Sequence, residues 1–185
     1  MAPPEGGRGL TLFTIGHGAG TAATFVERAR CPGVLRIVDV RSAPGSRRHP
    51  QFGREAMRQW LQESGISYTW EPRLGGFRKA RKDSPNTAWR NDSFRGYADH
   101  MDTAEFREAL NVVLTAAASE RTAVMCSETL WWRCHRRLIA DAAVLLHAVT
   151  VLHIDGDGRT APHRVTEGAV VEGSAVRYPA VSLSL

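Results

Sequence analysis

Five short apolar stretches, separated by segments with helical periodicity, constrain the fold of this 185-residue chain more than any other feature. Each stretch is rich in the β-branched and aromatic residues that favour β-strands. The stretches cover residues 10–15, 34–40, 66–70, 122–126 and 149–154. Strands that alternate with helices favour a parallel sheet. We therefore predict an α/β fold, an open and mostly parallel sheet of about five strands with helices on both faces.

The segments between these strands predict five helices. Their apolar residues recur at helical spacing, and several begin at a residue that can cap a helix. The expected helices begin near Thr21 or Thr24, near Gly53, at Tyr97, at Thr103 and at Arg133. Residues 10–185 are expected to form one α/β domain, with residues 154–185 as an irregular tail. The Pro- and Gly-rich residues 1–9 are expected to be disordered, and residues 71–93 to form a long polar loop.

The bulk composition limits the class of protein. No apolar run approaches the roughly 20 residues of a membrane span, and the first residues lack the apolar core of a signal peptide. Three scattered cysteines suit a reducing compartment, so a soluble cytoplasmic protein is expected. The net charge is +5, and of the 24 basic residues only Lys79 and Lys82 are lysine. Arginine binds phosphate and carboxylate in a bidentate manner.

Polar side chains follow the predicted strands at the points where the strands end. Right-handed crossovers bring the carboxyl ends of parallel strands to one edge of the sheet, where ligands bind in open α/β folds. We therefore expect a site that is assembled from distant parts of the chain. The residues at these strand ends are His17, Asp39, Arg41, Glu71, Arg73, Cys126, Glu128, His153 and Asp155.

Cys126 is the candidate nucleophile or redox thiol at this edge. A thiol that faces the amino terminus of the next helix, near Arg133 and Arg136, is expected to have a lowered pKa. His17 or His135 would act as the general base, and Asp39 or Glu128 would orient that base. The alternative is that Cys126 is simply a small apolar residue at the end of a strand.

The loops at the same edge are basic, with tryptophans between the basic residues. This pattern favours an anionic ligand that carries a stackable ring, either a nucleotide or single-stranded nucleic acid. The alternative is a solvated basic surface. The candidate substrate-binding residues are Arg41, Arg47, Arg48, Arg78, Arg133 and Arg136.

Cys126, Cys134, His135 and His17 are residue types that bind zinc. However, adjacent residues of a regular helix do not point at one ion, and Cys134 shares an apolar stripe with Leu138. Core packing is therefore expected for Cys134, and no metal ligand is assigned. Six residues lie between Cys126 and Arg133, one more than a phosphatase loop has, and the loop is too long for a rhodanese-like site. No glycine motif identifies a cofactor, and nothing indicates the oligomeric state.

Several motifs, taken together in this order, resemble the domain-of-unknown-function family 488. The motifs are Thr14–Gly18, Val38–Ser42, Ser46–Arg48, Pro50–Phe52, Leu74–Gly76, Gly96–Asp99, Met125–Cys126 and Arg133–Arg137. The resemblance implies an α/β domain of prokaryotic origin, but it supplies no activity and no catalytic residues. One departure is Trp131–Trp132, since similar proteins tend to have acidic or proline-rich residues between the two cysteines.

The leading hypothesis is a thiol-dependent enzyme that acts on an anionic, phosphate-bearing or nucleotide-like substrate. Two alternatives remain open: a nucleic-acid-binding module without catalysis, and a protein with a metal site built from Cys and His.

Overall fold

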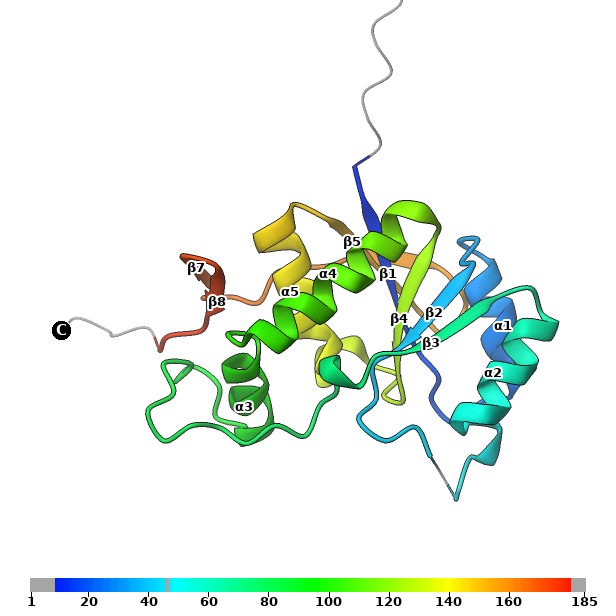
Figure 1. The fold of residues 1–185 in the computed structure, drawn as a ribbon, viewed down its shortest axis with the longest axis horizontal. Helices are drawn as coiled ribbons and strands as arrows, with labels where there is room; N and C mark the ends of the chain where they lie inside the picture. Colours follow the sequence, from blue (N-terminus) through cyan, green and yellow to red (C-terminus); the bar gives the residue numbers. More distant parts are fainter. Residues whose placement is uncertain (1–8, 46, 181–185) are drawn as a thin grey trace, which may run out of the picture.

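A six-stranded sheet forms the centre of the computed structural model, which describes residues 9–45 and 47–180 (Figure 1). Its strands lie in the order β3-β2-β4-β1-β5-β6. The first five strands are parallel to their neighbours, and only β6 is antiparallel. Their bounds are β1 (Thr11–Gly16), β2 (Arg36–Asp39), β3 (Ser67–Trp70), β4 (Thr122–Cys126) and β5 (Thr150–Ile154). The predicted α/β class and mostly parallel sheet are confirmed.

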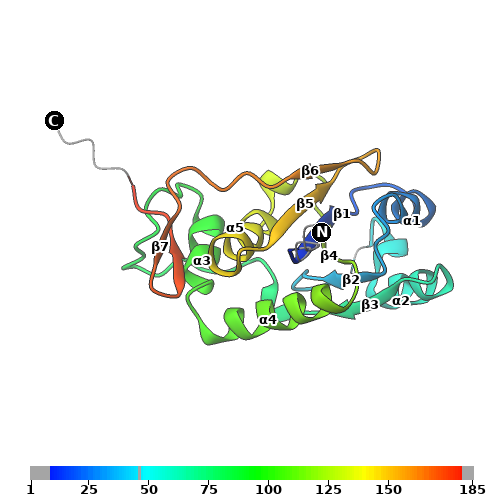
Figure 2. The ribbon, with the colours of Figure 1, turned by 90° about the horizontal axis from the view of Figure 1, so that it is seen from above.

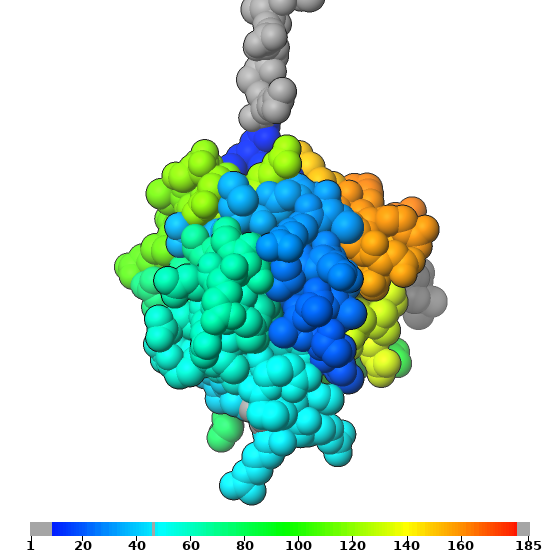
Figure 3. Space-filling model, turned by 90° about the vertical axis from the view of Figure 1, so that its right-hand side faces the viewer, coloured from blue at the N-terminus to red at the C-terminus, as the bar shows by residue number. Residues whose placement is uncertain are grey.

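Helices cover both faces of this sheet, as predicted. α1 (Ala22–Arg30) and α2 (Arg54–Glu63) lie on one face, and Figure 3 shows them as the blue and cyan segments that cover it. α4 (Ala104–Ser119) and α5 (Arg136–His147) lie on the other face, with α3 (Asp92–His100) beside them (Figure 2). Thr21 caps α1 with a reciprocal capping box, and Thr103 and Asn91 cap α4 and α3 through their side chains.

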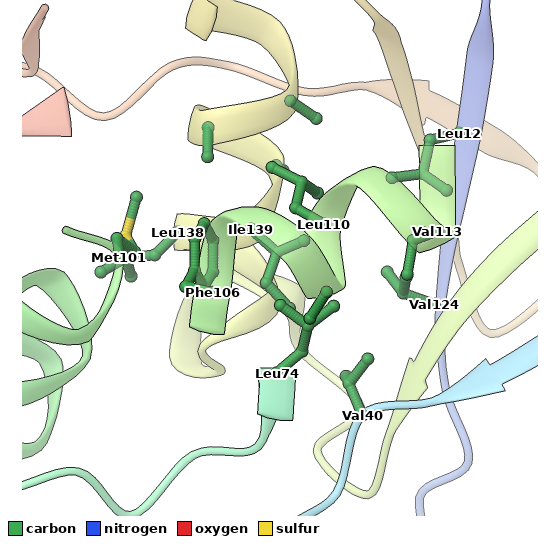
Figure 4. Close-up of a cluster of buried hydrophobic side chains, with 14 of the residues drawn as sticks. Leu12, Val40, Leu74, Met101, Phe106, Leu110, Val113, Val124, Leu138 and Ile139 are labelled. Carbon is green, nitrogen blue, oxygen red and sulfur yellow. The ribbon is translucent and has the colours of Figure 1, made fainter. Parts of the chain in front are cut away.

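Two hydrophobic cores lie on the two faces because successive side chains of a strand point in opposite directions. In β1, Leu12 contributes to the core with α4 and α5, whereas Phe13 and Ile15 contribute to the core with α1 and α2. Burial on both faces suits the apolar residues of β1 and β4, which are buried along almost their whole length, whereas β3 at the edge of the sheet is partly exposed. Figure 4 shows the first core, where Leu12 and Val124 of the sheet lie near side chains of α4.

The carboxyl-terminal segment, predicted to be irregular over residues 154–185, contains three short strands. β6 (Thr160–Pro162) pairs with β5, and β7 (Val170–Glu172) forms a hairpin with β8 (Ala175–Arg177). Tyr178 is 1% exposed and donates a hydrogen bond to Asp141 of α5, so this segment is packed onto the domain. Nearly all of the predicted disordered segment, residues 1–8, lies outside the described residues.

Two predicted helix boundaries are wrong. α3 begins at Asp92 rather than at Tyr97, inside the segment expected to be a loop. α5 begins at Arg136 rather than at Arg133, because Trp131–Arg133 forms a separate 3₁₀ turn. Two further 3₁₀ turns, Pro50–Phe52 and Pro72–Leu74, follow β2 and β3. The later start of α5 changes the candidate site, because it places Cys134 and His135 ahead of the helix.

None of the helices in the described part of the chain combines the length and the apolar character that a membrane crossing requires.

Candidate functional site

The carboxyl ends of the five parallel strands meet at the lower edge of the sheet in Figure 1. Cys126 is the last residue of β4 and pairs with Gly16 at the end of β1. The loop that follows Cys126 returns to the same edge through the 3₁₀ turn and enters α5. The predicted assembly of strand-end side chains at one edge is therefore present in the fold.

Two thiols and one imidazole converge at this edge. Sγ of Cys126, Sγ of Cys134 and a ring nitrogen of His135 all lie within 4.8 Å of one another. Nδ1 of His135 is 3.6 Å from Sγ of Cys134. Nε2 of the same ring is 3.1 Å from the carbonyl oxygen of Val40. A carbonyl only accepts hydrogen bonds, so Nε2 carries a proton, and in the neutral ring the Nδ1 lone pair faces the sulfur of Cys134.

The local backbone explains how adjacent residues reach the same point. Cys134 has extended dihedral angles (φ −124°, ψ 152°), and His135 is the residue that precedes α5. The prediction that Cys134 and His135 diverge rested on their being inside a helix, and it is wrong. Cys134 is 5% exposed and does pack in the core, as expected, but its sulfur atom faces Cys126 and His135.

The expectation that the pKa of Cys126 is lowered is also wrong. Hydrogen bonding to Cys134 and burial raise the pKa of Cys126 above its ordinary value. The same hydrogen bond from Cys126, together with the nearby guanidinium of Arg136, lowers the pKa of Cys134. Nε of Arg136 is 3.5 Å from Sγ of Cys134. The helix terminus and the arginine thus favour a thiolate, as argued from the sequence, but at the cysteine closer to both.

A cavity of about 260 Å³ opens onto this cluster of Cys126, Cys134 and His135, called here the Cys–Cys–His cluster. One wall is aromatic and comes from Phe94 and Tyr97 of α3 and from Phe77. Phe77 is 93% exposed and has a φ of 60°, which is unusual for a residue other than glycine. Such backbone strain is often found at functional sites.

The polar walls of the cavity come from the loops after β2 and β4. Arg133, Glu128 and Ser127 follow β4, and Arg41 and Ser42 follow β2. The Glu128 side chain is exposed and accepts a hydrogen bond from the backbone of its own loop. Glu128 therefore lines the same cavity as the cluster. Phe77 is one of the aromatic residues that the sequence places among the basic loops, whereas Ser127, Phe94 and Tyr97 were not predicted.

Asp39 and His17 do not belong to this cluster, because they point to the opposite face of the sheet. Asp39 is fully buried and accepts hydrogen bonds from Arg41 and from the hydroxyl of Tyr68. His17 stacks on Phe52 at 4.2 Å. The roles of general base and of orienting carboxylate predicted for these two residues remain predictions, and the geometry instead places His135 beside the thiols.

Both ring nitrogens of His17 are already engaged. Nδ1 donates to the Gly18 carbonyl at 2.7 Å, and Nε2 accepts from the Arg41 guanidinium at 3.2 Å. Burial, together with the positive charge of Arg41, lowers the pKa of His17 to about 4. The ring is therefore neutral at neutral pH and has no lone pair available for a substrate.

Only two of the six candidate anion-binding arginines line the cavity. Arg41 and Arg133 line the cavity, but the guanidinium of Arg41 is held by Asp39. Arg136 is 1% exposed and donates a hydrogen bond to the carbonyl of Glu128, so it stabilises the loop that follows β4. Arg78 donates hydrogen bonds to the carbonyls of Arg73 and Gly75. Arg47 and Arg48 are exposed and lie on a loop that does not line the cavity.

A second buried polar network lies beside the cysteine loop. His153 of β5 is hydrogen-bonded to Thr14 at 2.6 Å and to His163 at 2.9 Å, and His163 in turn bonds Asp141 at 2.8 Å. Trp131 stacks on the His153 ring at 4.0 Å. Burial lowers the pKa of His153 to about 3. This network connects the carboxyl-terminal segment to the turn that precedes Cys134.

A family model described as "Domain of unknown function DUF488" matches residues 21–143, which include α1 to α4, the cysteine loop and part of α5. Neither the curated proteins nor the solved structures give a match.

Proposed function

This chain belongs to the domain-of-unknown-function family DUF488, and we propose that it is a thiol-dependent enzyme that acts on a small anionic substrate. The reaction centre would be the Cys–Cys–His cluster. The observation that supports this proposal is the convergence of two thiols and one imidazole at the floor of the cavity. Neighbouring thiol and imidazole groups are the combination used by nucleophilic and redox cysteines.

The charges around the cavity favour an anion. Arg133 lines the cavity and is exposed, and the amino terminus of α5 begins directly after His135. A helix amino terminus carries a partial positive charge that adds to that of the arginine. Glu128 also lines the cavity, and its negative charge weakens the positive potential of Arg133 and the helix terminus. A substrate of modest negative charge therefore fits better than a highly charged one.

Alkylation of the reduced, metal-free protein tests both parts of the proposal. Iodoacetate is anionic and iodoacetamide is neutral, so the ratio of their rates at Cys134 reports the local field. Cys31 is an exposed free cysteine and serves as the reference within the same chain. We expect the ratio at Cys134 to exceed that at Cys31 about fivefold, equivalent to ~1 kcal/mol of partly screened attraction.

Arg133→Ala should remove most of this preference, and added salt should reduce it. Equal ratios at Cys134 and Cys31 would reject the anionic substrate, and the absence of modification at Cys134 would reject Cys134 as a reactive thiol. In a screen of small anionic compounds, any turnover should disappear in Cys134→Ser and persist in Cys31→Ser.

A nucleic-acid-binding surface is the second candidate, and a separate hollow favours it. This hollow is lined by Lys79, Arg81, Lys82 and Arg95, among other residues. If these four cations each contact one phosphate, affinity for a single-stranded oligonucleotide should fall roughly 50-fold between 50 and 200 mM salt. An affinity that does not change with salt would reject this candidate.

A further inference from the structure

The separation between the sulfur of Cys134 and the ring nitrogen of His135 matches the spacing of ligands around a tetrahedral zinc ion. Zinc lies about 2.3 Å from a cysteine sulfur and about 2.0–2.1 Å from a histidine nitrogen. Tetrahedral angles then place a sulfur and a nitrogen ligand roughly 3.5 Å apart. The observed separation of Cys134 Sγ and His135 Nδ1 is 3.6 Å, and one ligand atom from each of the three residues lies within 4.8 Å of the other two.

The His135 ring is fixed in the orientation that a metal ligand needs. Nε2 donates its proton to the carbonyl of Val40 at 3.1 Å, so in the neutral ring the lone pair is on Nδ1. Metal-binding histidines almost always donate their second nitrogen to a carbonyl, a carboxylate or water. A hydrogen bond of this kind sets both the tautomer and the direction of the lone pair.

The space next to Nδ1 is kept open by a glycine. A Cβ atom at Gly76 would meet Nδ1 of His135 at 3.1 Å, which is nearer than any other atom. Gly76 also lines the cavity. Any larger residue at this position would crowd the nitrogen that faces the two sulfur atoms.

The cluster offers three ligands, and the cavity offers the fourth position. Among residues 9–45 and 47–180, no fourth Cys, His, Asp or Glu joins the group. Structural zinc sites have four protein ligands, whereas catalytic sites have three and leave one position for water or substrate. The three residues line the cavity, so an ion held by them would be open to it.

We infer that Cys126, Cys134 and His135 bind one zinc ion whose fourth position faces the cavity. Two sulfur ligands and one imidazole suit zinc better than magnesium or calcium, which prefer oxygen. The inference rests on the proposed function for the location of the reaction centre, and it assigns the reacting group. The thiols would act as ligands, and the anionic substrate or a water molecule would occupy the fourth position.

Titration of the chelator-treated, reduced full-length chain with Co²⁺ tests this site. Co²⁺ adopts the same geometry as zinc and is coloured. We expect visible bands of tetrahedral Co²⁺ and near-ultraviolet thiolate-to-cobalt bands that saturate at one equivalent and disappear when Zn²⁺ is added. Absence of these bands in the wild-type chain would overturn the inference.

Variants assign the ligands. Loss of a residue that only hydrogen-bonds a metal ligand typically weakens binding roughly 10- to 100-fold. Cys134→Ser removes a ligand itself, so it should weaken zinc binding by more than roughly 100-fold. Gly76→Ala keeps both thiols and should weaken binding roughly 10-fold by crowding Nδ1. Cys31→Ser is the matched control and should bind zinc as the wild type does. Circular dichroism checks that each variant is folded, and tetrahedral bands that persist unchanged in Cys134→Ser would contradict the assignment.

The two proposals fail in different ways. If no tetrahedral bands form but Cys134 still prefers iodoacetate, the zinc inference is wrong and the proposed enzyme stands as a free-thiolate enzyme. If the bands form but the iodoacetate preference is absent, the metal site stands and the anionic substrate is wrong.

Discussion

Acidification from pH 7 to pH 5 is expected to destabilise this protein by about 4 kcal/mol through two buried histidines. His17 is 5% exposed and His153 is 3% exposed. Burial lowers the pKa of His17 to about 4 and that of His153 to about 3. Both rings are therefore neutral in the folded chain over this range, while the same rings in the unfolded chain take up protons.

The sign and size follow from proton uptake. The unfolded chain binds protons on these rings below their ordinary pKa of 6.5, so the free energy of unfolding falls as the pH drops. Each pH unit below 6.5 costs about 1.4 kcal/mol per ring until the folded pKa is reached. Since pH 5 lies above both folded values, each ring contributes about 2 kcal/mol, a large part of the 5–15 kcal/mol typical of a domain.

Urea unfolding followed by tryptophan fluorescence at pH 8, 7, 6 and 5 measures this effect. His153→Gln retains a hydrogen-bond donor and an acceptor but does not titrate, so its loss of stability from pH 7 to pH 5 should be about 2 kcal/mol smaller than that of the wild type. Between pH 8 and pH 7 the two proteins should change nearly in parallel, which is the internal control. If His153→Gln loses as much stability as the wild type on acidification, the reasoning is refuted.

Two further predictions concern the packing at the edge of the sheet. Gly16→Ala should destabilise the fold by about 3 kcal/mol or more, because its Cβ would lie 2.1 Å from a backbone carbonyl of the cysteine loop. Gly156→Ala, with no atom within 4 Å of the added Cβ, should leave the melting temperature nearly unchanged. Asp39→Ala should cost about 3–5 kcal/mol, because it leaves the buried charge of Arg41 without its partner. Glu55→Ala breaks an exposed ion pair and should cost less than about 1 kcal/mol in the same urea experiment, so similar losses in both variants would contradict the argument.

The fold could be predicted from the sequence because its main signals are local. The five parallel strands coincide with short stretches rich in β-branched, aromatic and other apolar residues, and the caps of α1 and α4 are threonines at the expected positions. The strands of the carboxyl-terminal segment were missed because each has only three residues and depends on packing against the rest of the domain. The early start of α3 is marked only by Asn91, within a long polar stretch.

The location of the site could be predicted, but its composition could not. The strand ends identified Cys126 and the edge of the sheet at which the cavity lies. The alternation of side chains in β2 and β4 separates Asp39 from Cys126, and this follows only from the strand register. The start of α5 has no Ser, Thr, Asp or Asn cap, so no local signal showed that Cys134 and His135 lie outside the helix.

The most direct test of the Cys–Cys–His cluster as one reaction centre is iodoacetate modification, resolved by peptide mass spectrometry, with and without one equivalent of Zn²⁺. We expect rapid modification of Cys134 in the metal-free protein and strong protection of Cys134 by zinc. The exposed Cys31 should react at the same rate in both samples. Reaction of Cys134 at the rate of Cys31, with no effect of zinc on either, would contradict the account.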